Sequence, residues 1–151
     1  MKTFLLSERT PESADRQRGL VVIELAITLP LVILIMFATA ELGRAFYQYT
    51  TLTKAIEAGT RYYASAVNDL TITTDKVLTT KNLIATASPD GSGAAVLPGF
   101  STGDVTVDAV FNDHVRVSAI YDFVPMLGAK LPIYGEIASF TMTVGHSLRT
   151  L

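Results

Sequence analysis

The chain has 151 residues, no cysteine and a formal net charge of −2. Hydrophobic residues make up 49% of it and charged residues 17%, with a mean hydropathy of +0.37, a composition that favours attachment to a membrane. The small acidic charge gives no electrostatic footprint for nucleic acid. The absence of cysteine excludes disulfides, thiolate catalysis and cysteine–zinc sites.

A basic, polar leader ends at Gly19, and a long apolar run follows at once. From Leu20 to Ala40 the run contains a single charged residue, Glu24. A membrane-spanning helix needs about 20 mainly apolar residues, so we expect one over 20–40. Arg16 and Arg18 precede the run, and positive charge stays in the cytoplasm. The N-terminus is therefore expected inside and the rest of the chain outside.

Glu24 is the costly residue of this run. An ionised side chain at the centre of a membrane helix costs about 2.5–3.5 kcal/mol, so intramembrane acids are treated as functional residues. Cleavage after Gly19 would create an α-amino group with a pKa near 8 on Leu20, close to this carboxylate. The simpler alternative is that Glu24 extends to the lipid head groups.

Pro30 lies in the middle of the run. It removes one backbone hydrogen bond and its ring presses on the carbonyl of Ala26, which predicts a kink or a loosened turn. Plain tolerance is an equally weighted alternative, because proline is common in membrane helices.

A second interpretation of the run is a removable signal peptide. Ala38-Thr39-Ala40 has the small-x-small pattern of a signal-peptidase site, and cleavage after Ala40 would release a secreted or periplasmic binding module. The length of the run, its acid and its proline argue against this, and the helical pattern continues past Ala40. An uncleaved single-pass membrane protein is the third possibility.

Beyond the run, the apolar spacing is that of an amphipathic helix, so one long helix is expected from Leu20 to about Ala66. The residues expected on its apolar face are Leu42, Ala45, Phe46, Tyr49, Leu52, Ile56, Gly59 and Tyr63. Those expected on its polar face are Arg44, Gln48, Thr51, Lys54 and Glu57. Glycine costs a helix up to about 1 kcal/mol, so Gly59 on the apolar face indicates close approach of a neighbouring element.

The remaining chain predicts a short helix and three strands. Thr73 or Thr74 is expected to cap a helix that ends near Ala87, and Ser88–Gly93 has the composition of a loop. Alternating apolar residues then predict half-buried strands over 105–111, 115–123 and 138–144. Asn112-Asp113 predicts a tight turn between the first two strands, which would make them an antiparallel hairpin. Residues 125–135 are expected to form a loop.

These elements predict an α+β fold of pilin-like form, in which a long N-terminal transmembrane and stalk helix packs on a small three-stranded antiparallel sheet. The expected divisions are a cytoplasmic leader (1–19), a transmembrane helix (20–40), its amphipathic continuation (41–67) and an extracytoplasmic α+β domain (68–151).

The N-terminal half resembles the TadE-like pseudopilins, minor components of the tight-adherence (Flp, type IVc) pilus. The similarity rests on Gly19-Leu20 with Glu24, on Pro30, and on the stretches Glu41–Tyr47 and Ala58–Tyr62. Leu25 stands where Flp-type prepilins often have an aromatic residue, which fits a minor pseudopilin better than the major pilin. TadE is favoured over its sibling TadF.

The resemblance implies that a membrane prepilin peptidase cuts between Gly19 and Leu20, and that Glu24 is the recognition and assembly residue. It further implies an inner-membrane location, possible incorporation in the pilus, and a role in pilus assembly, adhesion and biofilm formation. The implied partners are the membrane, the peptidase, other pilin and pseudopilin subunits and the Tad assembly platform.

Catalysis and metal binding are not expected. His114 and His146 are the two histidines of the chain, and both are interpreted as solvated surface residues outside any metal or triad motif. Asp104, Asp108 and Asp113 lack the dense spacing of a calcium loop. No cofactor is therefore expected.

Overall fold

A computed structural model describes residues 11–66, 73–111, 114–126, 130–131, 135–136 and 139–149, with side chains for 18–66, 73–108, 114–126 and 139–149. The chain divides into two compact units, an N-terminal unit that ends at Ala40 and a C-terminal unit over Glu41–Leu151. The predicted turn at Asn112-Asp113 lies outside the described residues.

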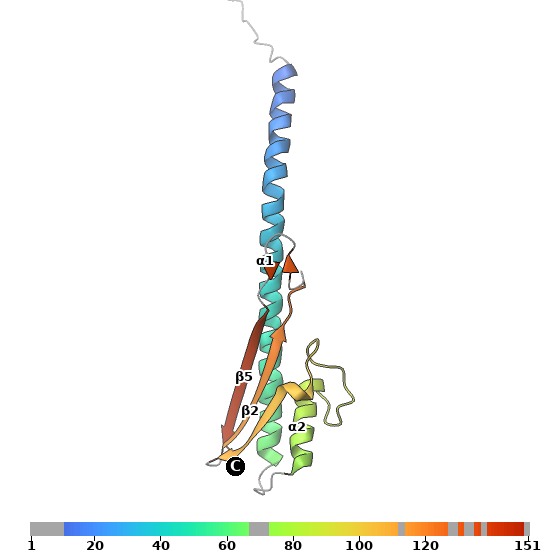
Figure 1. Cartoon of the computed structure of the whole chain (residues 1–151), viewed down its shortest axis with the longest axis vertical. Helices are drawn as coiled ribbons and strands as arrows, with labels where there is room; N and C mark the ends of the chain where they lie inside the picture. Colours follow the sequence, from blue (N-terminus) through green and yellow to red (C-terminus); the bar gives the residue numbers. More distant parts are fainter. Residues whose placement is uncertain are drawn as a thin grey trace, which may run out of the picture. The chain divides into compact units, whose positions relative to one another are not determined.

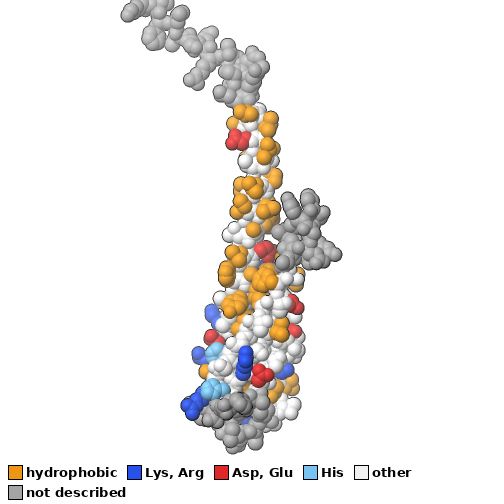
Figure 2. Space-filling view, turned by 60° about the vertical axis from the view of Figure 1, so that its left-hand side comes forward, with side chains coloured by type: hydrophobic (Ala, Val, Ile, Leu, Met, Phe, Trp, Pro, Cys, Tyr) orange, Lys and Arg blue, Asp and Glu red, His pale blue; other side chains and the backbone are white. Residues whose placement is uncertain are grey.

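The N-terminal unit is formed by the first part of helix α1, which spans Pro11–Ala66. The predicted start at Leu20 is wrong, because α1 begins in the leader. Proline suits the first position of a helix, where its missing N–H is not needed, and acidic residues such as Glu12 favour the first turn. Large apolar side chains between Leu20 and Phe37 are 43–71% exposed, and α1 is long and apolar enough to cross a membrane. Figure 2 shows these hydrophobic side chains along the helix.

The C-terminal unit combines the rest of α1 with a second helix and strands, which confirms the predicted α+β class. The elements are α2 (Thr74–Thr86), the 3₁₀ turn η1 (Thr102–Asp104), β1 (Val105–Phe111), β2 (His114–Phe123), β3 (Lys130–Leu131), β4 (Gly135–Glu136) and β5 (Phe140–Arg149). Within this unit β2, β5 and α2 lie alongside α1 (Figure 1).

The three long strands form one antiparallel sheet, as the sequence predicted, and the structure shows that their order is β1-β2-β5. The third strand is longer than expected and begins at Phe140, while Ala138 lies outside the described residues. The strands β3 and β4 pair antiparallel inside the segment expected to be a loop. Each has two residues, too few to show an alternating pattern.

The sheet has one buried face, set by the alternation on β2. Its apolar residues from Val115 to Phe123 are buried at every second position, and the residues between them are exposed or half-buried. Side chains from α1, α2, the sheet and the segment before η1 share one core, in which Leu52 and Ile56 of α1 are fully buried. Hydrophobic burial against α1 therefore holds the sheet.

The buried face of α1 differs in part from the predicted one. Ala45, Leu52, Ile56, Gly59 and Tyr63 are buried as expected, whereas Leu42, Phe46 and Tyr49 are exposed. Gln48, expected on the polar face, is only 5% exposed. Helix α1 has two apolar faces with helical spacing. The sheet covers the face that carries Ala45, Leu52 and Ile56, and Gln48 lies on this same face.

Gly59 allows α1 and α2 to approach closely, as the sequence indicated. A Cβ atom built on Gly59 would lie 2.2 Å from Cγ1 of Ile84 and 2.5 Å from its Cδ1. At Gly43 the same atom would meet nothing within 4 Å. Gly43 and Gly59 thus have different environments on the same helix, and of these two only Gly59 has a packing reason.

The ends of α2 depart from the prediction in detail. Thr73 occupies the N-cap with extended backbone, but its side chain makes no capping hydrogen bond. Ala87 ends the helix in the left-handed conformation, and its N–H donates to the carbonyl of Leu83. The loop that follows is held by Asp90, whose carboxylate accepts hydrogen bonds from Ser88 and Ser92.

Candidate processing and assembly site

Gly19 and Leu20 lie on an open part of α1. Both residues are exposed, and a Cβ atom built on Gly19 would meet nothing within 4 Å. The backbone there is helical, so the extended conformation that a protease cleft requires is not the one adopted. Glycine weakens a helix by up to about 1 kcal/mol relative to alanine, which lowers the cost of local unwinding at this bond.

Glu24 projects from the same exposed helix, one turn beyond Leu20. Its backbone carbonyl accepts a hydrogen bond from Oγ1 of Thr28 at 3.0 Å. The salt bridge seen among the described side chains involves Glu41 and Arg44 instead, so the Glu24 carboxylate has no ionic partner in that part of the chain. An ionised carboxylate in an apolar setting needs a cation or a hydrogen-bond donor, and the side chains described over 18–66 supply neither to Glu24.

Pro30 lies inside α1, and the helix continues on both sides of it. Since proline has no N–H, the carbonyl of Ala26 loses its usual helical donor. The structure therefore shows that the residue is tolerated in the helix, and the predicted kink stays a prediction.

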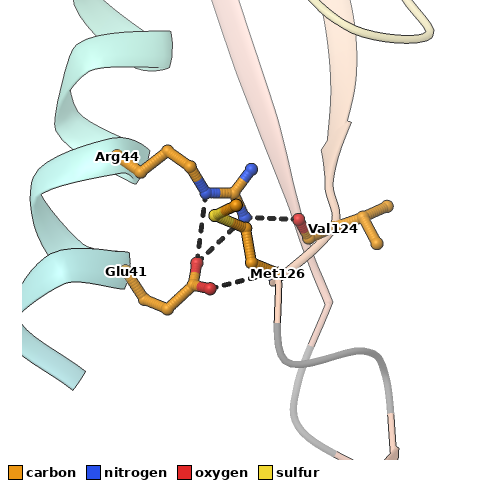
Figure 3. A network of polar contacts seen from close by, with 4 residues as sticks. All are labelled: Glu41, Arg44, Val124 and Met126. Carbon is orange, nitrogen blue, oxygen red and sulfur yellow. Dashed lines mark hydrogen bonds and ion pairs between the residues drawn. The ribbon is translucent and has the colours of Figure 1, made fainter. Parts of the chain in front are cut away.

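The first turn of the C-terminal unit carries a polar network that the sequence did not reveal. Arg44 donates to Oε2 of Glu41 from Nη2 at 2.9 Å and from Nε at 3.2 Å, and to the carbonyl of Val124 at 2.5 Å. The other carboxylate oxygen, Oε1 of Glu41, accepts the N–H of Met126 at 2.7 Å. Figure 3 shows this network joining α1 to the segment after β2. We call it the Glu41–Arg44 clamp.

The clamp also reaches the aromatic core. The guanidinium carbon of Arg44 lies 4.4 Å from the ring centroid of Phe123, within the range of a cation–π interaction. Burial raises the pKa of Tyr121, and the nearby positive charge of Arg44 opposes that rise. The Tyr121 hydroxyl donates to the carbonyl of Pro98 at 3.1 Å. One arginine therefore couples an acid, a backbone carbonyl and two aromatic rings.

The histidines differ in their surroundings. His114 is exposed, as predicted, whereas His146 is half-buried and its Nδ1 is buried without a hydrogen-bond partner among the described residues. The prediction of a solvated surface residue is therefore wrong in part for His146. In the described part of the chain, no three or more His, Asp or Glu residues gather as a metal site would require. Asp104 instead accepts hydrogen bonds from the backbone N–H and the hydroxyl of Ser101.

The arrangement is that of an α+β domain whose first helix continues from an apolar segment compatible with a single membrane crossing. Residues 19–61 match the family model described as TadE-like protein, which confirms the resemblance seen in the sequence. The match spans 43 of the 151 residues, all of them within α1. No curated protein and no solved structure matches the chain.

The matched segment begins at Gly19 and includes Glu24, Pro30 and both side chains of the clamp. The sequence identified Glu24 and Pro30 from the conflict between their chemistry and an apolar helix, and Gly19 as the residue that ends the basic leader. It placed Arg44 on the polar face of the helix and included Glu41 and Arg44 in the stretch that carries the resemblance, without indicating a contact of either. Their backbone partners are 80 or more residues away in the chain, and no local pattern identifies such contacts.

Proposed function

We propose that this chain is a minor pseudopilin of a Tad (Flp, type IVc) pilus, with TadE favoured over TadF. The observation that carries the proposal is the family match, which starts at Gly19 and includes Glu24. In this role a prepilin peptidase hydrolyses the bond between Gly19 and Leu20. The mature subunit stays in the inner membrane or enters the pilus, where it serves assembly, adhesion and biofilm formation.

The proposed chemistry gives Glu24 its missing partner. Hydrolysis adds water across the Gly19–Leu20 bond and leaves a carboxylate on Gly19 and an amino group on Leu20. The α-amino group has a pKa near 8 and is mostly protonated at neutral pH. When apolar helices bundle, the carboxylate of Glu24 pairs with the Leu20 amine of a neighbouring subunit. Opposite charges that share a low-dielectric site offset part of each other's desolvation cost.

The orientation follows from the charges of the leader. Arg16 and Arg18 precede the apolar run, which supports an N-terminus in the cytoplasm and a C-terminal unit outside. The competing interpretation, release of a soluble module after Ala40, requires an accessible extended bond there. Helix α1 runs without a break through both Gly19 and Ala40, and only Gly19 has the weak helix propensity that lowers the cost of unwinding, which favours cleavage at the Gly19–Leu20 bond.

The mature N-terminus tests the proposal. Residue 20 as the first residue of the membrane-bound protein supports cleavage by a prepilin peptidase. Residue 41 supports the secreted module, and an intact residue 1 supports an uncleaved membrane protein. A bulky Gly19→Val change should block processing, and unaffected cleavage of this variant would refute the peptidase assignment.

Assembly is tested separately at Glu24. Glu24→Gln keeps the shape of the side chain but removes its charge, so we expect normal membrane insertion and loss of incorporation into pili. Thr28→Ala, one turn further along the same exposed face, is the matched control and should leave assembly unchanged. Pili that incorporate Glu24→Gln at the normal level would refute the assembly role.

A further inference from the structure

Two segments of the C-terminal unit that the clamp joins, the first turns of α1 in this unit and the residues after β2, expose four large apolar side chains. Leu42 and Phe46 of α1 are 57% and 62% exposed, and Val124 and Met126 after β2 are 60% and 81% exposed. Soluble surfaces carry isolated apolar residues without consequence, but a gathered set marks an interaction site. We call these four residues the apolar collar.

The clamp holds the two segments of the collar together. Met126 N–H binds Glu41, and the carbonyl of Val124 binds Arg44, so both residues are fixed beside the helical turn that carries Leu42. All of these contacts lie inside the C-terminal unit. The collar is therefore a defined part of the domain, located where the chain has just left its apolar run.

The charges within the collar are already neutralised. In the segments 41–49 and 124–126 the charged residues are Glu41 and Arg44, which form an ion pair of 2.9 Å. Both oxygens of the carboxylate accept hydrogen bonds, and the guanidinium has the Val124 carbonyl and the Phe123 ring as further partners. Charges that are paired and hydrogen-bonded enter a medium of low polarity at much smaller cost than free ones.

The distances fit the boundary zone of a bilayer. A core of about 30 Å takes up 20 residues of helix, and the polar zone on each side adds roughly 5–7 Å. If the core begins at Leu20, it ends near Ala40, so the polar zone begins at the residue that opens the C-terminal unit. At about 1.5 Å per residue, this zone reaches the level of Ala45 and Phe46. Tyr47 and Tyr49 follow, both exposed, and tyrosine is enriched at such boundaries.

We propose that the apolar collar inserts into the head-group zone of the bilayer that α1 spans, so that the C-terminal unit rests on phospholipid. The occupant of this surface is lipid because the collar continues directly from an apolar run of membrane-spanning length. The inference depends on membrane crossing by α1 but not on cleavage after Gly19 or on pilus assembly. The clamp then has a purpose beyond folding, since it presents Val124 and Met126 to the membrane in charge-neutral form.

Fluorescence quenching tests the contact. The chain has no tryptophan, so a single introduced one reports only on its own position. Met126→Trp and Phe46→Trp probe the collar in the full chain, reconstituted in phosphatidylethanolamine–phosphatidylglycerol vesicles. Lipids with a nitroxide near the head group, or deep in the acyl chain, serve as quenchers. Ile120→Trp is the matched control, because Ile120 is 53% exposed on the outer face of β2.

The proposal predicts strong quenching of both collar probes by the head-group nitroxide, with a blue-shifted emission, and little quenching of Ile120→Trp. Phe37→Trp, inside the apolar run, should be quenched best by the deep nitroxide. Collar probes that behave like Ile120→Trp, while Phe37→Trp is quenched, would overturn the proposal and leave the membrane span intact. Absence of quenching at position 37 would overturn the membrane crossing on which the proposal depends.

Discussion

Gly59 of α1 and Ile84 of α2 are so close that a Cβ atom on the glycine would lie 2.2 Å from Cγ1 of the isoleucine. Gly59→Ala should therefore force the helices apart and destabilise the C-terminal unit by about 1–3 kcal/mol, the usual cost of overpacking. Thermal unfolding of the full chain in detergent, followed by circular dichroism, measures the effect. In an Ile84→Ala background the added methyl group has room, so its further cost should fall.

Gly43→Ala is the matched control on the same helix. Nothing lies within 4 Å of its added Cβ atom, so only helix propensity changes and a stabilisation of up to about 1 kcal/mol is expected. Equal destabilisation by the two substitutions would contradict a packing role that is specific to Gly59.

Gln48 lies in the core with an unsatisfied amide oxygen. The residue is 5% exposed, and its Oε1 is buried without a hydrogen-bond partner among the described residues. An unpaired buried polar atom costs about 1–3 kcal/mol, so Gln48→Met, which keeps the length of the side chain, should raise the melting temperature. Lys54→Met, at an exposed position of the same helix, should change stability by less than about 0.5 kcal/mol. A lower melting temperature for Gln48→Met would indicate that the amide has a partner in the folded protein.

The burial of Gln48 shows that helical spacing did not identify which face of α1 is buried. Leu42, Phe46 and Tyr49 share one helical face, and Ala45, Leu52 and Ile56 share another. Both faces satisfy the helical spacing, so periodicity alone does not say which one the sheet covers. Gln48 lies on the face of Ala45, Leu52 and Ile56, and a polar residue there favoured exposure of that face. On β2 the alternation was unambiguous, because a strand has only two faces and one of them was wholly apolar.

Contacts between segments that are far apart in the chain could not be predicted from the sequence either. Glu41 and Arg44 are spaced i, i+3 on the helix, a spacing at which opposite charges can pair. Their additional partners are the backbone groups of Val124 and Met126, and every residue offers the same backbone groups whatever its side chain. Gly59 was recognisable because a glycine on an apolar helical stripe conflicts with helix propensity, and a conflict of that kind needs a structural reason.

Asp90 gives the loop after α2 a dependence on acid. Hydrogen bonds from the side chain of Ser88, at 2.5 Å, and from Ser92 lower the pKa of Asp90 to about 2 from its ordinary 3.8. Because the folded pKa lies below the unfolded one, these contacts stabilise the loop fully above about pH 4 and are lost as the pH falls towards 2. NMR titration of the Asp90 carboxyl should give a midpoint near 2, and Ser88→Ala should raise it. An unshifted midpoint in the unmodified protein would show that the loop does not hold the carboxylate in solution.

Loss of the Glu41–Arg44 clamp should destabilise the C-terminal unit. Arg44→Gln removes the ion pair with Glu41 and the bond to the Val124 carbonyl, and hydrogen bonds to charged groups contribute about 1.5–3 kcal/mol each. The two side chains are 26% and 19% exposed, so we expect a total loss near the lower end of that range. Hydrogen exchange at the Met126 amide, which Glu41 holds, should become faster.

The same substitution has an electrostatic readout that a merely structural change would not give. Burial raises the pKa of Tyr121 and the charge of Arg44 opposes the rise, so Arg44→Gln should raise that pKa further. Arg44→Lys keeps the charge and loses the planar fork, so it should preserve the Tyr121 pKa while Met126 still exchanges faster. Glu57→Ala, elsewhere on α1, should change neither quantity. If Arg44→Gln left both the Met126 exchange rate and the Tyr121 pKa as they are, the clamp would not form in the folded protein.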